Sequence, residues 1–487
     1  MISIEKNVRS ADMYIGGEWL PALSGRRFAV RNPATLETIA EVADGGAEEA
    51  RLAIAAAHAA FAGWSQTPAA ERARLLHRAA DLINARRDGL AAIVTSENGK
   101  PLADAKGELA GATEFLRWNA EEAVRINGHV LPLANASTRL LTLRQPVGVV
   151  AAIVPWNFPA SMVTRKIAPA LAAGCTVVLK PAPQTPLIAV ELFKLFHEAG
   201  FPKGVVNLVT GLNAAPIGDE FLSSTLVAKI TFTGSTAVGK RILARAADTV
   251  KRVSLELGGH APFLVFADAD LDRAAAAAAS SGFRNSGQVC VSTNRVLVER
   301  SVAEEFTARL ADKARALRAG DGLAPGTDVG PLIDERGLGK VMHHVEDARA
   351  RGATVLAGGR RPDLAPHLRG FFYEPTVLGD VPRDALVMHQ ETFGPVVPVA
   401  SFDNEGEAVR IANDTRYGLA AYFFTRDVGR IFRLAEQLEY GIVGANDARP
   451  FGPNVPFGGM KESGLGRENG FEGVAEFLET KAVAVGF

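Results

Sequence analysis

Four short blocks of the sequence place chemically useful residues beside turns. Cys290 ends GQVC after a glycine, Glu256 stands in the apolar stretch LELGG, and Asn157 stands in PWNFP at the end of an apolar run. The fourth block, ETFGP, places Glu391 beside an aromatic residue and a sharp turn. Such residues can supply a nucleophile, a general base and a fixed amide donor. Each also has a structural interpretation, as a small buried thiol, an edge-strand carboxylate or a helix cap.

The elements that must position these blocks alternate between strands and helices. A strand over 149–154 leads into a helix over 159–173, and a strand over 230–232 leads into a helix over 237–247. This alternation predicts βαβ units and a parallel sheet, so the expected fold class is α/β. Further strands are expected at 137–145, 176–179, 205–209, 253–257, 263–266, 296–298 and 477–487, and further helices at 47–64, 69–87, 102–125, 186–199, 270–281 and 302–317.

The composition excludes several classes of protein. The chain has 487 residues, with 53 Lys and Arg against 54 Asp and Glu, so no global attraction to nucleic acid or anionic membranes is expected. Two cysteines allow one disulfide at most, which indicates a reducing compartment. No secretory signal is recognisable, and no apolar run approaches the ~20 residues that span a membrane. The composition therefore favours a cytoplasmic protein of about three domains.

Two nucleotide-binding signatures are incomplete in this sequence. The segment GSTAVGK (234–240) looks like a phosphate loop, but Arg241 follows where Mg²⁺ binding needs Ser or Thr. What remains is a helix N-terminus suited to a diphosphate. The G-x-G-x-x-G fingerprint is absent. His343 and His344 lie in a charged helical segment and are expected to be solvated, and no zinc spacing occurs, so no metal site is predicted.

Taken together, the blocks resemble the aldehyde dehydrogenase superfamily along nearly the whole chain. The matching blocks, in the order typical of that family, are PWNFP (155–159), KPA (180–182), FTGS (232–235), LELGG (255–259), GQVC (287–290), ETFGP (391–395) and PFGGMKESGLGRE (456–468). Within it, the closest resemblance is to the succinate-semialdehyde dehydrogenases, through SMVTRK (161–166), FRNSGQ (283–288), NDTRYGLAAYFF (413–424) and LEYGIVG (438–444).

The resemblance implies a catalytic role for three residues. Cys290 would attack the aldehyde as a thiolate, and the oxyanion would be held by the Asn157 amide and the Cys290 backbone N–H. Hydride loss to a nicotinamide leaves a thioester, and Glu256 would activate the water that hydrolyses it. The apolar surroundings of Glu256 are expected to raise its pKa. Cys175 is expected to be structural.

The resemblance also implies a cofactor site. It assigns the adenosine ribose to Lys180, the diphosphate to Gly234 and Ser235, and the nicotinamide ribose to Glu391, with the remaining lining from Trp156, Leu257 and Phe393. Pro183 stands where NADP-preferring members often have Ser, and proline offers neither a hydroxyl nor an N–H. We therefore expect NAD to be preferred, with NADP still possible.

The expected substrate is a short aldehyde with an anionic tail. Arg165 and Arg284 match two arginines with which the succinate-semialdehyde group holds a carboxylate, although a helix-borne arginine can also be salt-bridged to structure. The loop 447–453 departs from that group, because Phe451 replaces a Ser contact and Arg449 adds a cation. Succinic semialdehyde, a longer, hydroxylated or sulfonated aldehyde such as sulfolactaldehyde, and a general aldehyde dehydrogenase activity all remain open. A non-catalytic structural protein on the same fold is the distant alternative.

The resemblance implies three parts. The cofactor-binding domain, of Rossmann-like type, takes residues 1–121 and 143–255, and the α/β catalytic domain takes 256–446. A small β oligomerisation flap combines 122–142 with the tail 447–487. The family norm is a homo-oligomer, a tetramer or a dimer. No nucleic acid or membrane partner is expected.

Overall fold

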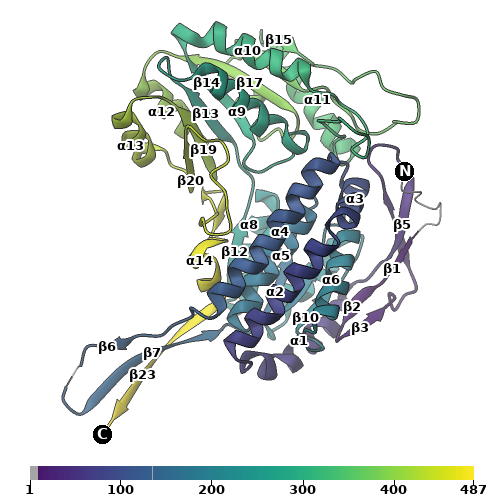
Figure 1. Cartoon of the computed structure of the whole chain (residues 1–487), viewed down its shortest axis with the longest axis vertical. Helices are drawn as coiled ribbons and strands as arrows, with labels where there is room; N and C mark the ends of the chain where they lie inside the picture. The colour runs from purple at the N-terminus through teal and green to yellow at the C-terminus, as the bar shows by residue number, and fades with distance from the viewer. Residues whose placement is uncertain (1–8, 134) are drawn as a thin grey trace.

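Two large sheets with helices packed around them organise the chain in a computed structural model that describes residues 9–133 and 135–487 (Figure 1). The first sheet has eight strands in the order β22-β12-β11-β8-β9-β10-β2-β3, and the second has seven in the order β15-β16-β17-β14-β13-β19-β20. The central strands of both sheets are parallel. The α/β prediction is therefore confirmed.

The strands of the first sheet are β2 (Met13–Ile15), β3 (Glu18–Leu20), β8 (Val149–Ile153), β9 (Thr176–Lys180), β10 (Val206–Leu208), β11 (Val227–Thr233), β12 (Arg252–Glu256) and β22 (Gly464–Leu465). Those of the second are β13 (Ala261–Val265), β14 (Thr293–Glu299), β15 (Thr354–Ala357), β16 (Thr376–Gly379), β17 (Val396–Phe402), β19 (Ala420–Phe424) and β20 (Ile442–Ala445). Smaller sheets contain β1 (Arg9–Ala11), β4 (Arg27–Arg31), β5 (Thr38–Ala43), β6 (Val130–Leu131), β7 (Thr138–Pro146), β18 (Tyr417–Gly418), β21 (Met460–Lys461) and β23 (Leu478–Gly486).

The helices are α1 (Ala47–Ser65), α2 (Ala69–Ala85), α3 (Arg87–Asn98), α4 (Leu102–Ala123), α5 (Pro159–Ala173), α6 (Leu187–Ala199), α7 (Ala214–Ser223), α8 (Thr236–Ala246), α9 (Leu271–Phe283), α10 (Ala303–Ala316), α11 (Glu335–Ala350), α12 (Glu405–Asn413), α13 (Val428–Gln437) and α14 (Gly470–Ala475). Local sequence explains α5 well. Proline at its first position presets the helical φ angle, and Gly174, at φ +94°, ends it in the left-handed region.

The site lies where the two sheets face each other. Asn157, Lys180, Gly234 and Glu256 follow or end the parallel strands β8, β9, β11 and β12, so they share the carboxyl edge of the first sheet. Cys290 precedes β14 at the amino edge of the second sheet. Carboxyl edges of parallel sheets are where such folds bind ligands. The topology thus brings the separate sequence blocks together: the Asn157 side chain contacts Gln288, and Gly259 packs against the Cys290 carbonyl.

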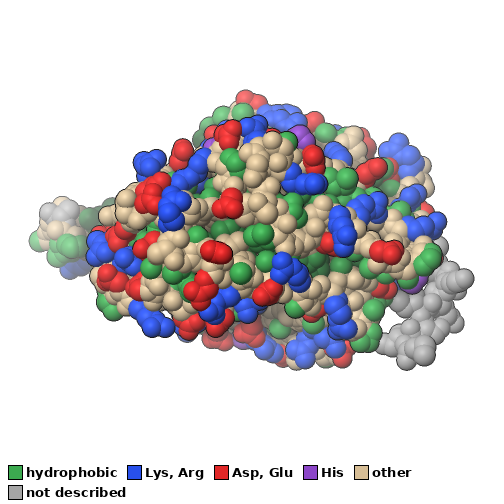
Figure 2. Space-filling model, turned by 90° about the horizontal axis from the view of Figure 1, so that it is seen from above, with side chains coloured by type: hydrophobic (Ala, Val, Ile, Leu, Met, Phe, Trp, Pro, Cys, Tyr) green, Lys and Arg blue, Asp and Glu red, His purple; other side chains and the backbone are tan. Residues whose placement is uncertain are grey.

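A three-stranded sheet projects from the body and joins distant parts of the chain. The C-terminal strand β23 pairs antiparallel with β7, and β7 also pairs with β6 (Figure 1). In Figure 2 this projection extends to the left and carries hydrophobic side chains. Val130 on β6 and Phe487 just after β23 are both exposed. Elsewhere on that face, basic and acidic side chains are interspersed.

Several details differ from the sequence-based expectation. The helix expected over 69–87 ends at Ala85 and a separate helix, α3, begins at Arg87. The start of α3 is exposed and charged, and its apolar residues show too little helical periodicity to predict a separate helix. His344 was expected to be solvated, but it is 2% exposed and shares a 3.1 Å hydrogen bond with the Thr392 hydroxyl, because it faces the second sheet's core from α11; His343 is exposed. The strand β22, which adds an edge to the first sheet, was not anticipated.

Candidate active site

The turn before Cys290 is held in an unusual backbone conformation. Asn285 and Ser286 both have positive φ angles, 48° and 57°, which non-glycine residues rarely adopt. At Gly287 a Cβ would lie 2.0 Å from the Gly394 carbonyl oxygen, so only glycine fits there. A Cβ at Gly259 would likewise meet the Cys290 carbonyl oxygen at 2.2 Å. The thiol is therefore placed by close backbone contacts, a strain typical of functional sites.

Glu256 is a buried carboxyl with no hydrogen-bond partner among the described residues. Burial, reinforced by the nearby Glu468 carboxylate, raises its pKa to about 8. This agrees with the expectation from its apolar neighbours. The Cys290 thiol lies beside it, and burial together with the Glu256 charge raises the pKa of that thiol well above its usual range. A resting thiol next to an unpartnered carboxyl suits proton transfer between them.

The Asn157 side chain is fixed beside Cys290. Its amide donates to the Gln288 carbonyl at 3.1 Å, and its carbonyl oxygen accepts from the Phe158 N–H at 3.1 Å. The Cys290 N–H has no acceptor in the part of the chain that the structure describes. A fixed amide and a free N–H next to the nucleophile are the donor set that an oxyanion requires.

The residues expected at the cofactor's adenosine end lie along the first sheet. Lys180 is 2% exposed, and among the described residues its amine donates only to the Pro181 carbonyl, at 3.0 Å. Burial lowers the pKa of Lys180 to about 8. Pro183 lies half-buried in the turn that follows β9. Gly234 donates to the Glu256 carbonyl at 3.0 Å, and Ser235 precedes α8 without capping it. The first N–H groups of α8 are therefore left to an external acceptor.

The residues expected at the nicotinamide end form a compact group. Glu391 accepts from the Gly259 N–H at 3.0 Å, and burial raises the pKa of Glu391. The Trp156 and Phe393 rings meet edge to face at 5.6 Å. The Leu257 side chain packs so closely on α8 that a Cβ at Gly239 would lie 2.4 Å from it.

The two candidate substrate arginines have different surroundings. Arg165 on α5 lies between the Phe115 and Phe457 rings, at 5.0 and 4.3 Å, and its guanidinium is 3.6 Å from the Glu468 carboxylate. Arg284 rests on the Phe158 ring at 4.9 Å and has no ion-pair partner within the described residues. Arg284 is therefore the more available cation of the two.

The loop 447–453 runs back from β20 across the second sheet. The Phe451 ring lies 5.8 Å from Phe457 and 6.5 Å from Tyr422, and it packs against the core. Arg449 is exposed and donates to the Ser280 hydroxyl at 2.6 Å. Burial lowers the pKa of Arg284, the Asp104 carboxylate opposes that shift, and Arg449 lowers the pKa by a smaller amount.

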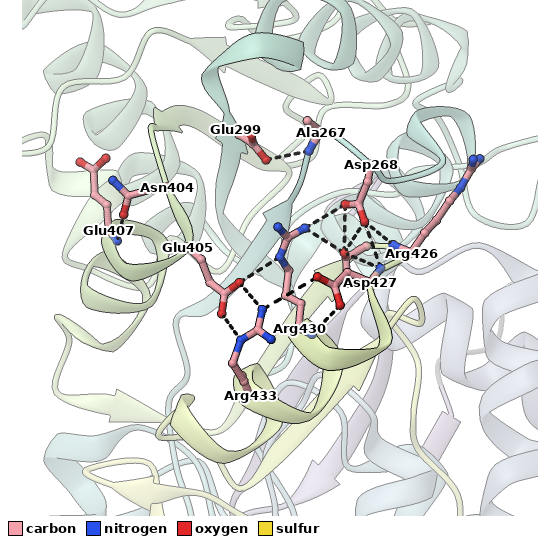
Figure 3. A network of polar contacts seen from close by, with 11 residues as sticks. Ala267, Asp268, Glu299, Asn404, Glu405, Glu407, Arg426, Asp427, Arg430 and Arg433 are labelled. Atoms are coloured by element: carbon pink, nitrogen blue, oxygen red, sulfur yellow. Dashed lines mark hydrogen bonds and ion pairs between the residues drawn. The ribbon is translucent and has the colours of Figure 1, made fainter.

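A polar network anchors the start of this loop. Asp268, just after β13, accepts from the Thr425 hydroxyl at 2.8 Å and from Arg430 at 3.0 Å (Figure 3). The Thr425 N–H donates to the Asn446 side chain at 3.0 Å, immediately before the loop. Through these bonds, the ends of β13, β19 and β20 hold the loop in one position.

Sequence reasoning missed several residues of the site. Lys166 and Glu468 form a buried ion pair behind Glu256, and Tyr422 donates from its hydroxyl to the Val291 carbonyl at 2.8 Å beside Cys290. All three lie inside blocks already singled out, so an acid, a base and a phenol within otherwise apolar motifs were available signals. Among the described residues, no group of His, Cys, Asp and Glu is arranged to hold a metal, and no helix is long and apolar enough to cross a membrane.

Known proteins match this chain over nearly its whole length. Residues 19–483 match the aldehyde dehydrogenase family. The chain is 49% identical to a 3-sulfolactaldehyde dehydrogenase of Pseudomonas putida, covering 97% of this chain and 96% of the relative. It is 48% identical to the NADP⁺ succinate-semialdehyde dehydrogenase of Escherichia coli, covering 99% of each. The crystal structure of betaine aldehyde dehydrogenase from Staphylococcus aureus in complex with NAD⁺ superposes with a TM-score of 0.95 at 37% identity, covering 98% and 95% of the two chains.

Proposed function

The chain belongs to the aldehyde dehydrogenase family, and we propose that it oxidises a short aldehyde with an anionic tail to the carboxylic acid. One arrangement carries this proposal: the Cys290 thiol lies beside the unpartnered Glu256 carboxyl, and Arg284 stands nearby without a carboxylate partner. The similar proteins named for sulfolactaldehyde and succinate semialdehyde act on aldehydes that share an anionic far end.

In the first half of the reaction, Cys290 is the nucleophile. Its thiol gives its proton to Glu256, and the thiolate sulfur bonds to the aldehyde carbon to form a thiohemiacetal oxyanion. The Asn157 amide and the Cys290 N–H donate to that oxyanion and stabilise it. The nicotinamide cofactor, when bound, accepts the hydride that leaves the aldehyde carbon.

In the second half, Glu256 is the base. A thioester on Cys290 must be hydrolysed. Glu256 first releases to solvent the proton it took from Cys290, and the ionised carboxylate then takes a proton from the attacking water. The resulting tetrahedral oxyanion uses the same two donors. Collapse expels the Cys290 thiolate and releases the acid. A carboxyl whose pKa is about 8 binds and releases protons near neutral pH, which both halves require.

The residues present fit NAD or NADP. The uncapped start of α8 at Gly234 and Ser235 suits a diphosphate, and the Lys180 amine has protons to spare for a ribose hydroxyl. Glu391 would hold the nicotinamide ribose, and the nearby walls are Trp156, Leu257 and Phe393. Pro183 supports a preference for NAD, because it offers no donor to a 2′-phosphate.

For the anionic tail we propose Arg284 as the main anchor. Arg449 adds positive charge near Arg284, and the Phe451 ring, next to Tyr422, stands where the succinate-semialdehyde group supplies a Ser contact. Arg165 is already balanced by Glu468, so its contribution is smaller. A guanidinium fork suits both a carboxylate and a sulfonate, which leaves the length and head group of the tail to be measured.

We also propose a homo-oligomer, a dimer or a tetramer, assembled through the flap. The exposed apolar side chains of β6, β7 and β23 support this, since apolar groups gathered on a projecting sheet mark an interaction surface. The proposed division keeps residues 1–121 with 143–255 for the cofactor and 256–446 for catalysis. The flap comprises 122–142 and 447–487, of which β22 joins the first sheet.

The test is a rate screen with NAD⁺ and NADP⁺ over succinic, glutaric, sulfonated and neutral short aldehydes. Anionic aldehydes should give the higher kcat/KM. Cys290→Ala should abolish turnover. Glu256→Gln should slow both halves of the reaction, so that acyl-enzyme detectable by mass forms slowly and then persists. A preference for neutral aldehydes would indicate a general aldehyde dehydrogenase. Full activity of Cys290→Ala would contradict the mechanism, and no turnover of any aldehyde would support the non-catalytic alternative.

A further inference from the structure

A buried ion pair touches the backbone of Asn157, although neither partner belongs to the site described above. Lys100 lies between α3 and α4, and Glu108 lies on α4. Both side chains are fully buried, with 2.5 Å between the Lys100 amine and the Glu108 carboxylate. Burying two charges costs several kcal/mol unless their remaining hydrogen bonds are also satisfied. The other hydrogen-bond partners of Lys100 and Glu108 therefore show which part of the protein this pair stabilises.

Each charge makes its further bonds to the segment that carries Asn157. The Lys100 amine donates to the main-chain carbonyl oxygen of Asn157 at 2.7 Å and lies 4.0 Å above the Phe158 ring. The Glu108 carboxylate accepts from the N–H groups of Ala160 and Ser161, at 2.8 and 3.2 Å, at the start of α5. The pair thus holds the turn by hydrogen bonds at Asn157 and at the two residues that begin α5 after it.

We propose that Lys100 and Glu108 are positioning residues for the oxyanion site. A carboxylate at the start of α5 satisfies that helix, but alone it would set a negative charge near the developing oxyanion. The Lys100 cation neutralises it and fixes the peptide from which the Asn157 amide projects. The Asn285 amide, which also donates to the Asn157 carbonyl, at 2.9 Å, completes the support from the Cys290 turn. This inference rests on the proposed function, since it concerns the same reaction.

The principal variant is Lys100→Met, which removes the charge at similar length. Kcat should fall about 10- to 100-fold, because a small misplacement of an oxyanion donor costs that much. The KM for NAD⁺ should stay within about twofold, since the cofactor residues keep their contacts. Lys106→Met is the matched control. Lys106 is on α4 but forms an exposed ion pair with Asp88 at 3.0 Å, so the kcat of this variant should equal that of the unaltered enzyme.

Alkylation of Cys290 by iodoacetamide separates positioning from loss of structure. That reaction displaces iodide at carbon and forms no oxyanion. The alkylation rate of Lys100→Met should therefore match that of the unaltered enzyme. If Lys100→Met does not fold, the double variant Lys100→Met/Glu108→Gln removes both charges and keeps an acceptor for α5; it should show the same loss of kcat.

Three results would be decisive. If either folded variant has a kcat within about twofold of that of the unaltered enzyme, this inference is overturned and the proposed function stands. A parallel fall in kcat and alkylation rate also overturns it, because the pair would then hold the whole Cys290 region rather than the oxyanion donor. If the unaltered enzyme and Lys106→Met oxidise no aldehyde, the proposed function fails as well.

Discussion

Substitution of Arg284 by Met should change which aldehydes the enzyme prefers. Methionine keeps apolar contact with Phe158 and removes the cation. Arg284 forms no ion pair among the described residues, and Glu108, the buried carboxylate that acts on it, keeps Lys100 as its partner. The folded structure should therefore persist, and the deficit should appear in substrate recognition.

The size of the effect follows from the lost contact. A hydrogen bond to a charged group contributes about 1.5–3 kcal/mol, and at about 1.4 kcal/mol per tenfold this predicts a fall of roughly 10- to 150-fold in kcat/KM. A neutral aldehyde has no charged tail, so its kcat/KM should change less than about threefold. The assay is NADH formation with succinic semialdehyde and with propanal, measured on the same enzyme preparations.

Arg165→Met provides the comparison. Its partner Glu468 also acts on Glu256, so removing Arg165 should lower the rates with both aldehydes to a similar extent. The ratio of the two kcat/KM values should therefore change in Arg284→Met and stay nearly constant in Arg165→Met. Equal losses with both aldehydes in Arg284→Met would show that this arginine is structural, and the substrate proposal would revert to a general aldehyde dehydrogenase.

Three further results are expected. Because burial raises the pKa of Glu256 to about 8, deacylation-limited kcat should rise with pH and reach at pH 7 roughly a tenth of its plateau; Glu468→Gln should move the midpoint lower, and a flat profile would contradict this role. Lys180, with a pKa of about 8, loses its charge as pH rises, so kcat/KM with NADP should fall relative to NAD, and strong NADP preference at every pH would refute the reading of Pro183. Burial raises the pKa of Cys175 to about 11, and Ser292 stands two residues after Cys290, so peroxide should leave no Cys290–Cys175 disulfide in non-reduced peptide maps.

Much of the fold and of the candidate site could be anticipated from short stretches of sequence. The alternation of strands and helices from residue 149 onward follows local periodicity, and each strand expected there by residue range lies within a few residues of an observed strand. The chemistry-bearing blocks were recognisable because residue type and neighbouring glycines or prolines reflect local demands, such as the tight turn before Cys290. The raised pKa of Glu256 also followed from its apolar neighbours.

What the tertiary structure alone decided is which charges meet. Arg165 looked as free as Arg284 in the sequence, but Glu468, about 300 residues later, pairs with it. His344 was expected to be solvated but is buried, and nothing in the sequence near Lys100 indicates that its amine donates to the main-chain carbonyl of Asn157. Local pattern reports propensity and periodicity over a few residues, whereas burial and ion pairing depend on groups far apart in the chain. The sequence by itself therefore determined the elements and the reactive residues, and the packing of the two sheets determined their partners, protonation and availability.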